Sequence, residues 1–139
     1  MTEVVPDQEN NLSIDKPKIL LVEDDVVLRD VYFSRFENES FNVVVASDGE
    51  EALAKAVREM PDLIILDVMM PKISGFDVLD ILRSTPETKN TKVVMMTALS
   101  QDSDKARGEK LNVNKYLIKS QVTLEDVVKT VKEVLNTLD

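Results

Sequence analysis

The sequence of 139 residues contains no cysteine and no histidine. The absence of cysteine excludes disulfides, thiolate chemistry and cysteine metal sites. The absence of histidine excludes a histidine general base, a histidine metal site and a phosphohistidine on this chain. Any chemistry of the chain must therefore come from carboxylates, hydroxyls and amines.

Long apolar runs and basic residues are also scarce. No run approaches the roughly 20 apolar residues that a membrane-spanning helix needs, and the first residues lack the charged and then apolar pattern of a signal peptide. Lysine and arginine number 17 against 26 acidic residues, which gives a net charge of −9. This balance argues against unaided binding to nucleic acid, which relies on basic surface. We therefore expect a cytoplasmic protein that contacts neither nucleic acid nor membrane.

Length and composition indicate one soluble domain with a core of its own, because hydrophobic residues make up 43% of the chain. Residues 1–16 are polar, acid-rich and without periodicity, which predicts a flexible acidic tail before a folded domain at 17–139. Within that domain, short β-branched or apolar runs predict five strands: Ile19–Val22, Val43–Ala46, Leu63–Leu66, Val93–Met96 and Tyr116–Ile118.

Stretches with helical spacing lie between and after these runs. One predicted helix has an apolar face made of Leu28, Val31, Tyr32 and Phe36. The last predicted helix has a face made of Leu124, Val127, Val128, Val131, Leu135 and Leu138. Asp48 marks a polar helix start, and Thr123 with Asp126 resembles a capping box that opens the last helix.

The alternation of five strands with five helices implies an α/β fold, in which helices cover both faces of a parallel sheet. In open sheets of this kind, ligands bind beyond the carboxyl ends of the strands, where the strand order reverses. The residues that follow the predicted strands are therefore the first candidates for a site.

Polar side chains stand at four of the predicted strand ends. They are Glu23, Asp24 and Asp25 after the first strand, Asp67 at the third, Thr97 at the fourth and Lys119 at the fifth. Each has an ordinary explanation when taken alone: acids suit a helix start, a lone aspartate often forms a turn, and a threonine or lysine can cap a helix or face solvent. Their convergence on one edge of the sheet favours a functional site.

The strand-end residues offer hard oxygen ligands and one amine. Such ligands suit Mg²⁺, which one or two carboxylates typically hold together with water and phosphate, and a cation would relieve the repulsion among the acids. An aspartate can attack phosphorus and form an aspartyl phosphate. The transferred group then needs a metal, an ammonium, a hydroxyl and backbone N–H groups. We therefore expect the acids to hold Mg²⁺ and the Mg²⁺ to hold phosphate.

Four segments carry this pattern in order: LLVEDD, DLIILDVMMPKISGFDVL, VVMMTA and YLIK. Together they closely resemble the receiver domain of bacterial two-component response regulators, the CheY-like fold, over Pro17 to Leu138. The resemblance implies a flavodoxin-like, doubly wound (βα)5 fold with a five-stranded parallel sheet in the order 2-1-3-4-5.

The resemblance also implies a metal site and a phosphoacceptor. Glu23 and Asp24 match the acidic pair that binds Mg²⁺ in the family, and Asp67 matches the phosphoacceptor. The backbone carbonyl of Met69 matches the remaining protein ligand of the metal. Asp25 matches a more variable position and is left outside the ligand set.

Three further residues match the family's switch. Thr97 matches the hydroxyl that contacts the phosphoryl group, and Lys119 matches the lysine that pairs with it. Tyr116 matches the aromatic that moves inward when the hydroxyl is drawn toward phosphate, although from the residues alone a half-buried strand aromatic without this role is as good a reading. Pro71 and Gly75 match the turn that follows the phosphoacceptor.

The sequence departs from the family pattern at two loops. Ser120 follows the lysine where the family usually has proline, often in a cis bond. A non-proline cis bond costs roughly 2.5–4 kcal/mol, so we expect a trans bond here and a somewhat different position of Lys119. Asn112 replaces a frequent glycine before the fifth strand, which is a mild change because asparagine tolerates the left-handed conformation.

A third departure concerns the residues two positions beyond the phosphoacceptor and the switch hydroxyl. These are Met69 and Leu99, and neither can hydrogen-bond an attacking water. The sequence therefore predicts slow self-dephosphorylation.

The resemblance implies a phosphorylation-dependent signalling switch that is no enzyme beyond its own phosphotransfer and slow autodephosphorylation. Phosphate would come from a sensor histidine kinase, a phosphotransfer protein or a small phosphodonor. Phosphorylation would change the surface made by the fourth helix, the fifth strand and the fifth helix. We expect that surface to bind an unknown output protein or to form a homodimer, because no DNA-binding or enzymatic domain follows the last helix of this sequence. The sequence is equally compatible with a receiver domain excised from a longer protein.

Three other functions fit the residues less well. An interaction module that works without phosphorylation would be indicated by loss of an acid or of the lysine, and this chain keeps them all. A flavodoxin-type cofactor binder needs a loop rich in serine, threonine and glycine after the first strand, where this chain has EDDVVLRD. A phosphohydrolase with an aspartate nucleophile commonly has a second acid two residues on, and here that residue is Met69.

Overall fold

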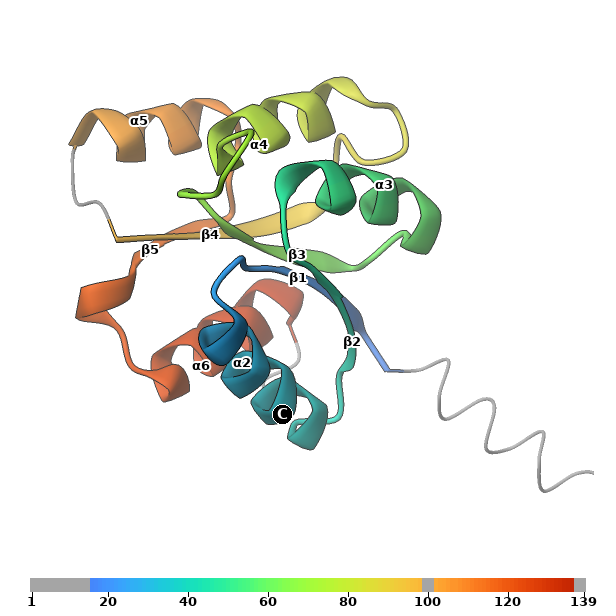
Figure 1. Cartoon of the computed structure of the whole chain (residues 1–139), viewed down its shortest axis with the longest axis vertical. Coiled ribbons are helices and arrows are strands. Elements are labelled where there is room, and N and C mark those ends of the chain that lie inside the picture. Colours follow the sequence, from blue (N-terminus) through green and yellow to red (C-terminus); the bar gives the residue numbers. More distant parts are fainter. Residues whose placement is uncertain (1–15, 99–101, 137–139) are drawn as a thin grey trace, which may run out of the picture.

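The computed structural model describes residues 16–98 and 102–136, which form a sheet between two layers of helices (Figure 1). Residues 1–15 of the predicted tail lie outside the described residues, and Lys16 lies within them. Leu99 and Leu138, which were named above, also lie outside them. None of the helices in the described ranges is long and apolar enough to cross a membrane.

Five parallel strands form the sheet within these residues: β1 (Lys18–Val22), β2 (Asn42–Ala46), β3 (Leu63–Asp67), β4 (Lys92–Thr97) and β5 (Lys115–Ile118). Their order is β2-β1-β3-β4-β5, which confirms the predicted doubly wound topology. Each predicted strand lies within an observed strand, so the β-branched and apolar runs located all five correctly.

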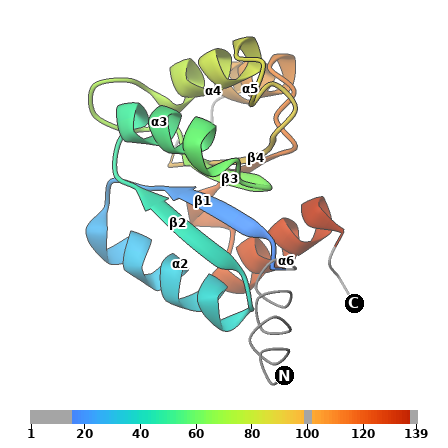
Figure 2. The same ribbon diagram turned by 90° about the vertical axis from the view of Figure 1, so that its right-hand side faces the viewer.

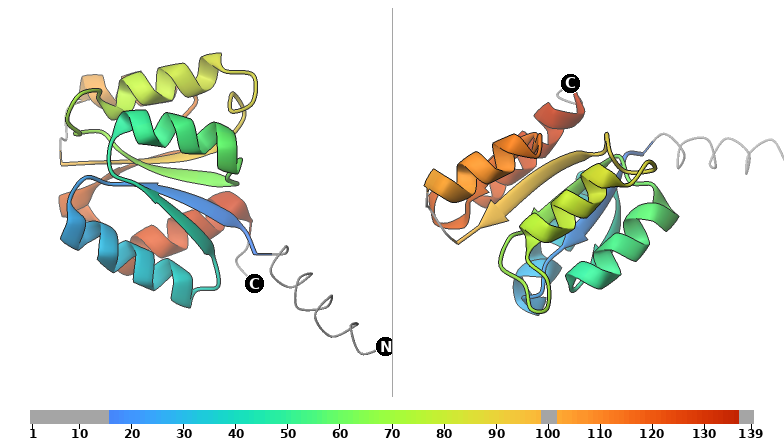
Figure 3. Two further views of the ribbon diagram at one scale, coloured as in Figure 1. Left: turned by 45° about the vertical axis from the view of Figure 1, so that its right-hand side comes forward. Right: turned by 90° about the horizontal axis from the view of Figure 1, so that it is seen from above.

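The described α-helices are α2 (Val26–Asn38), α3 (Gly49–Glu59), α4 (Gly75–Ser84), α5 (Asp102–Lys110) and α6 (Leu124–Leu135). Helices α3, α4 and α5 cover one face of the sheet, and α2 and α6 cover the other (Figures 2 and 3). Successive side chains of a strand point to opposite faces. In β1, therefore, Leu20 and Val22 join the core on the α3 side, whereas Ile19 and Leu21 join the core beneath α2 and α6.

Two helices begin at the predicted capping residues. The Asp48 side chain accepts a hydrogen bond from the Glu51 N–H (2.8 Å) at the start of α3. Thr123 and Asp126 form a complete capping box at the start of α6. Each cap satisfies N–H groups that a helix start leaves without an intrahelical partner.

The predicted apolar face of α2 is wrong at one position. Tyr32 and Phe36 are buried, but Val31 is 46% exposed. The buried stripe also takes in Leu28 and Phe33, which pack against the same core. A stripe through these residues puts Val31 on the outer side of the helix.

Candidate functional site

The predicted site lies between β1 and β3, where the strand order reverses. Glu23 directly follows β1, and its N–H donates to the Ala46 carbonyl at the end of β2 (3.1 Å). Asp67 is the last residue of β3, and Thr97 is the last residue of β4. The sheet therefore brings the predicted strand-end residues to one edge.

Three carboxylates form a cluster at this edge, which we call the acidic cluster: Glu23, Asp24 and Asp67. One oxygen atom from each lies within 4.8 Å of the other two. Glu23 and Asp67 are buried, each with 3% of its surface exposed, whereas Asp24 is exposed. This set of hard oxygen ligands fits Mg²⁺, and the exposed Asp24 leaves one side of the cluster open to water and phosphate.

Lys119 reaches the acidic cluster from the end of β5. Its Nζ lies 3.0 Å from Glu23 Oε1 and 3.4 Å from Asp67 Oδ1. The peptide bonds of the described residues are all trans, so the bond between Lys119 and Ser120 is trans, as predicted. The chain then turns through a short 3₁₀ helix, and the lysine contacts both buried acids without the family's proline.

The buried part of the acidic cluster has two carboxylates beside the single ammonium of Lys119, and the pKa of Asp67 is raised in this environment. Burial, and next the charge of Glu23, raise the pKa of Asp67 to about 7. Lys119 and the Met69 N–H, which donates to Asp67 Oδ1 (3.3 Å), oppose this rise. Burial lowers the pKa of Lys119, but its hydrogen bond to Glu23 and the nearby Asp67 outweigh burial and raise that pKa overall. Two buried carboxylates share one ammonium, so a second cation would be stabilised here.

The loop after Asp67 depends on the glycine that begins α4. A Cβ atom at Gly75 would lie 2.3 Å from the Asp67 carbonyl oxygen, and the Gly75 N–H donates to the Val68 carbonyl (2.8 Å). Met69 stands in this loop with 52% of its surface exposed. Its N–H contacts Asp67, while the role of its carbonyl as a metal ligand stays a prediction.

The two predicted switch residues lie on neighbouring strands. Thr97 is fully buried, and Tyr116 of β5 is half-buried, with its ring stacked on Phe76 of α4 at a centroid distance of 6.3 Å. Burial, and next the charge of Asp104, raise the pKa of Tyr116, and the Thr97 hydroxyl opposes the rise. The Tyr116 hydroxyl is buried and has no hydrogen bond of good geometry among the described residues. The ring thus faces the core next to Thr97, and its switching role stays a prediction.

Asn112 adopts the left-handed conformation, with φ of 60°. A residue that replaces glycine at this position was expected to adopt the left-handed conformation, which asparagine tolerates. The Asn112 carbonyl accepts a hydrogen bond from Arg83 Nη2 (3.1 Å), which holds the turn before β5. Asn112 therefore has the expected backbone conformation, and the mildness of the replacement stays a prediction.

Two contacts that orient Glu23 were not predicted from the sequence. Arg29, in the first turns of α2, donates from Nη1 to the Glu23 carbonyl (3.1 Å). The Asp25 N–H donates to Glu23 Oε2 (3.2 Å), while the Asp25 side chain caps α2 by accepting from the Leu28 N–H (3.1 Å). Asp25 therefore supports the acidic cluster without belonging to it. The acidic residues before α2 were a sequence signal for the cap that Asp25 forms. No sequence pattern predicts the contact of Arg29 with the Glu23 carbonyl.

Comparison with known proteins gives a family and relatives. The family model of the response regulator receiver domain matches residues 19–132, a range that includes the acidic cluster and Lys119. The transcriptional regulatory protein CpxR of Escherichia coli (strain K12) is 45% identical over 102 residues, which are 73% of this chain and 42% of CpxR. The chain spans about half or less of the length of the curated relatives that it matches.

Solved structures of similar proteins share the fold. The chemotaxis protein CheY4 of Vibrio cholerae is 31% identical with a TM-score of 0.80, over 86% of this chain and 98% of that chain. The response regulator TrrA of Thermotoga maritima, solved in complex with Mg²⁺ and BeF, is 30% identical with a TM-score of 0.75. That match covers 85% of this chain and 98% of TrrA.

Proposed function

This chain belongs to the family of response regulator receiver domains, and on this premise we propose that it is a phosphorylation-dependent signalling switch. One observation carries the proposal: Asp67 is a buried carboxylate beside two other acids and a lysine. It lies at the edge where sheets of this kind bind ligands. Asp67 is the proposed phosphoacceptor.

In the proposed transfer, an oxygen of the Asp67 carboxylate attacks the phosphorus atom of the donor. The bond between phosphorus and the donor's leaving atom breaks, and the leaving group keeps its electron pair. Asp67 becomes an acyl phosphate. Glu23 and Asp24 are suited to hold Mg²⁺ beside it, and a bound Mg²⁺ would neutralise charge on the phosphoryl oxygens. The TrrA complex with Mg²⁺ and BeF supports this choice of metal.

Lys119 and Thr97 are the proposed contacts of the transferred group. Lys119 Nζ lies within 3.4 Å of both Glu23 and Asp67, so we expect it to contact a phosphoryl group carried by Asp67. Thr97 ends β4, the strand next to β3, and its hydroxyl can donate to a phosphoryl oxygen. Both groups stabilise charge that the transfer brings to Asp67.

Tyr116 and α5 are proposed to carry the change to the surface. A Cβ atom on Gly108 of α5 would lie 3.6 Å from Tyr116 Cδ2, so the ring faces this part of α5 with space for little more than a methyl group between them. A movement of Thr97 toward the phosphoryl group would change this packing and shift the equilibrium between two arrangements of α5, β5 and α6. That surface then binds an output protein or a second copy of the chain.

The proposed donor is a sensor histidine kinase or a phosphotransfer protein, with small phosphodonors as a second source. Three valines at the start of α2 support a protein donor, because clustered exposed apolar side chains mark protein contacts. They are Val26 (56% exposed), Val27 (74%) and Val31 (46%). Since α2 begins directly after Glu23, Asp24 and Asp25, we expect the first of these valines to lie near the acidic cluster.

Intact mass spectrometry after incubation with Mg²⁺ and acetyl phosphate tests the proposal. The wild type should gain the mass of one phosphoryl group, whereas Asp67→Ala, or the wild type without Mg²⁺, should gain none. Asp25→Asn is the matched control, because Asp25 is a neighbouring acid that caps α2. This variant should still be phosphorylated.

A wild-type protein that is folded and binds Mg²⁺ but gains no mass would contradict the proposed role of Asp67. It would favour the alternative, an interaction module that works without phosphorylation. Circular dichroism and a Mg²⁺ titration on the same sample separate this result from misfolding.

A further inference from the structure

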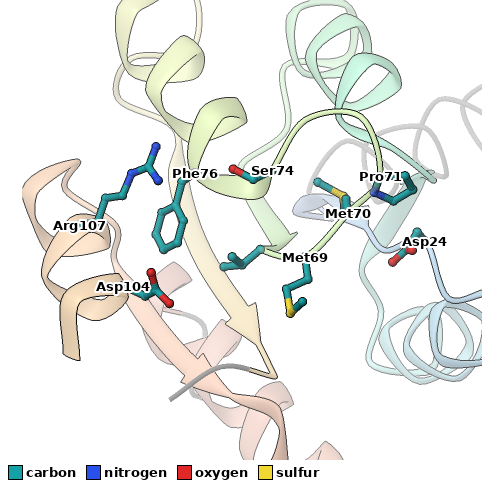
Figure 4. A pocket seen from close by; sticks show the side chains of 9 residues that line it. Asp24, Met69, Met70, Pro71, Ser74, Phe76, Asp104 and Arg107 are labelled. Atoms are coloured by element: carbon teal, nitrogen blue, oxygen red, sulfur yellow. The ribbon is translucent and has the colours of Figure 1, made fainter. Parts of the chain in front are cut away.

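A pocket lies beside the acidic cluster, between the loop that follows β3 and helix α5 (Figure 4). Its volume is ≈ 520 Å³. Ligand pockets of proteins measure roughly 300–1,000 Å³, so the space suits one or two inserted side chains or a small molecule.

Most of the pocket wall is apolar. Met69, Met70 and Pro71 come from the loop, and Phe76 comes from the start of α4 (Figure 4). Met69 is 52% exposed, although it is a large apolar side chain. Methionine side chains adapt to the shape of what they contact. The wall therefore fits an apolar side chain and does not demand one particular shape.

The charges at the two ends of the pocket are negative. Asp24 lies at one end and Asp104 of α5 at the other (Figure 4). Neither of them forms an ion pair with a residue of the described ranges. Arg107, which also lines the pocket, lies 4.8 Å from the centre of the Phe76 ring and 3.4 Å from Asp77. Asp77 matches the charge of Arg107 in this way. The pocket therefore offers a cation the carboxylate of Asp104 and, when no Mg²⁺ is bound, that of Asp24, which is also a proposed Mg²⁺ ligand.

We propose that this pocket is a docking site for a basic segment of a partner protein. The segment inserts one apolar side chain between Met69 and Phe76 and places lysine or arginine beside Asp24 and Asp104. Charge complementarity selects this occupant, because an acidic segment would meet the exposed Asp24, the half-buried Asp104 and the neighbouring buried acids of the acidic cluster. The inference does not require phosphoryl transfer. A partner seated here would nevertheless touch Asp24 of the acidic cluster.

Two capped tripeptides, Lys-Phe-Lys and Glu-Phe-Glu, test the proposal because they present the same apolar side chain with opposite charge. The protein is labelled with ¹³C at its methionine methyl groups and titrated with each peptide by NMR. Met69 and Met70 report on the pocket, and Met60, which is 57% exposed at the end of α3, reports non-specific contact. We expect saturable shifts of the pocket methyls with a Kd of about 1 mM for the lysine peptide and about tenfold weaker binding of the glutamate peptide.

Two substitutions on α5 separate the pocket from the general charge of the helix. Asp104→Asn should weaken the lysine peptide about threefold. Glu109→Gln removes an exposed charge from the same helix outside the pocket and should leave the affinity unchanged. Both positions are on the surface of α5, so both variants should fold.

Several results would overturn the proposal. Equal affinity of the two peptides, equal effects of the two substitutions, or a Met60 shift as large as that of Met69 would each show non-specific binding. No shift of the pocket methyls up to about 5 mM peptide would show that the pocket does not bind such segments. Binding of phenethylammonium as tight as that of the lysine peptide would make the pocket a site for small organic cations.

Discussion

At the amino end of the sheet one lysine meets one glutamate, since Lys18 Nζ lies 3.1 Å from Glu59 Oε1. At the carboxyl end Lys119 faces two buried carboxylates, Glu23 and Asp67. The hydrogen bond from Lys18 is the main cause that lowers the pKa of Glu59. Burial, and next the charge of Glu23, raise the pKa of Asp67 to about 7. The ion pair at the amino end stabilises the fold, whereas the excess acid at the carboxyl end opposes folding.

Both ends belong to one sheet, so the fold itself does not require unmatched charge. Ionisable groups with strongly shifted pKa values gather at functional sites, where the shift serves chemistry. Stability is lost where local rules are broken for function. The contrast between the two ends therefore points to the carboxyl edge as the functional one, independently of any relative.

Among the substitutions that test the contrast between the two ends of the sheet, Asp67→Asn should change the free energy of unfolding most. The pKa of Asp67 in the folded protein, about 7, lies above its ordinary value of 3.8, so folding favours the protonated form. The resulting stability is complete below about pH 3.8, falls as the pH rises, and is gone above about pH 7. Without Mg²⁺, the substitution should raise the free energy of unfolding by about 2–4 kcal/mol near pH 8.

Urea denaturation over a series of pH values measures this effect. The wild type should lose stability between the two pKa values, and the variant should lose much less. Asp62→Asn is the control at the amino end, where the Asp62 carboxylate accepts a hydrogen bond from the Lys18 N–H (2.7 Å). That substitution should slightly destabilise the protein. Stabilisation by both substitutions would remove the contrast between the two ends.

Arg83, which lies outside the acidic cluster, is a cation whose side chain forms four hydrogen bonds. It donates to the backbone carbonyls of Lys89, Thr91, Leu111 and Asn112 at 2.8–3.2 Å. Burial lowers the pKa of Arg83. The hydrogen bonds to the Thr91 and Leu111 carbonyls are partly buried, so removal of the side chain leaves these two carbonyls without this donor. Arg83→Met should therefore lower the free energy of unfolding by about 2 kcal/mol.

Two variants control for loss of charge alone. Arg58 is 64% exposed and lies 3.5 Å from Glu59, so Arg58→Met should change the free energy of unfolding by less than about 0.5 kcal/mol. Arg83→Lys keeps the charge but lacks the planar fork, and should recover less than half of the loss. Full recovery by lysine would show that charge, and not the four hydrogen bonds, matters at this position.

Met69→Asn addresses the lifetime of the proposed acyl phosphate. Met69 follows Asp67 by two residues and is 52% exposed, and its side chain cannot hold an attacking water. A carboxamide at this position can orient such a water, so the phosphoryl group should be lost about tenfold faster, which corresponds to about 1.4 kcal/mol in the barrier.

Intact mass against time, after removal of the phosphodonor, gives the rate of loss. Met60→Asn is the matched control, because Met60 is similarly exposed (57%) at the end of α3. It should leave the rate unchanged. A wild-type lifetime of only seconds, or equal rates for the wild type and Met69→Asn, would contradict the expectation of slow dephosphorylation.

Sequence reasoning succeeded where structure follows from order along the chain. The β-branched runs located the strands, and parallel order then brought Glu23, Asp67 and Thr97 to one edge of the sheet. Local contacts were equally accessible, as in the capping box between Thr123 and Asp126. Such features involve neighbours in sequence or the general geometry of a parallel sheet.

The remaining features depend on how elements are oriented, which no short pattern encodes. The hydrogen bond from Arg29 to the Glu23 carbonyl needs the precise start of α2. The outward direction of Val31 needs the rotation of that helix against the sheet. The pocket beside Met69 needs the distance between a loop and α5. Each is decided by packing between elements, and a sequence read alone carries little of that information.

Glu51 provides the smallest effect and tests whether position or hydrogen-bond donors set the pKa of an acid at the carboxyl edge. Glu51 is in the first turn of α3, and its side chain contacts Ser47, the residue that directly follows β2. Its Oε1 accepts a hydrogen bond from the Ser47 N–H (2.8 Å), and its Oε2 lies 2.9 Å from Lys55 Nζ. The Ser47 N–H, and next Lys55, lower the pKa of Glu51 from 4.5 to about 2. Its stabilisation is therefore present above about pH 4.5 and is lost as the pH falls toward 2.

Glu51→Gln should lower the free energy of unfolding by about 0.5 kcal/mol near pH 7, because the side chain is 38% exposed and water screens its charge. Near pH 2 the variant and the wild type should be equally stable in urea. If Glu51→Gln instead stabilised the protein at neutral pH, as Asp67→Asn should, any acid at this edge would oppose folding. The raised pKa of Asp67 would then be a property of the edge. Opposite signs for the two substitutions would assign it to the missing donors and cations around Asp67, which is the condition that a bound metal corrects.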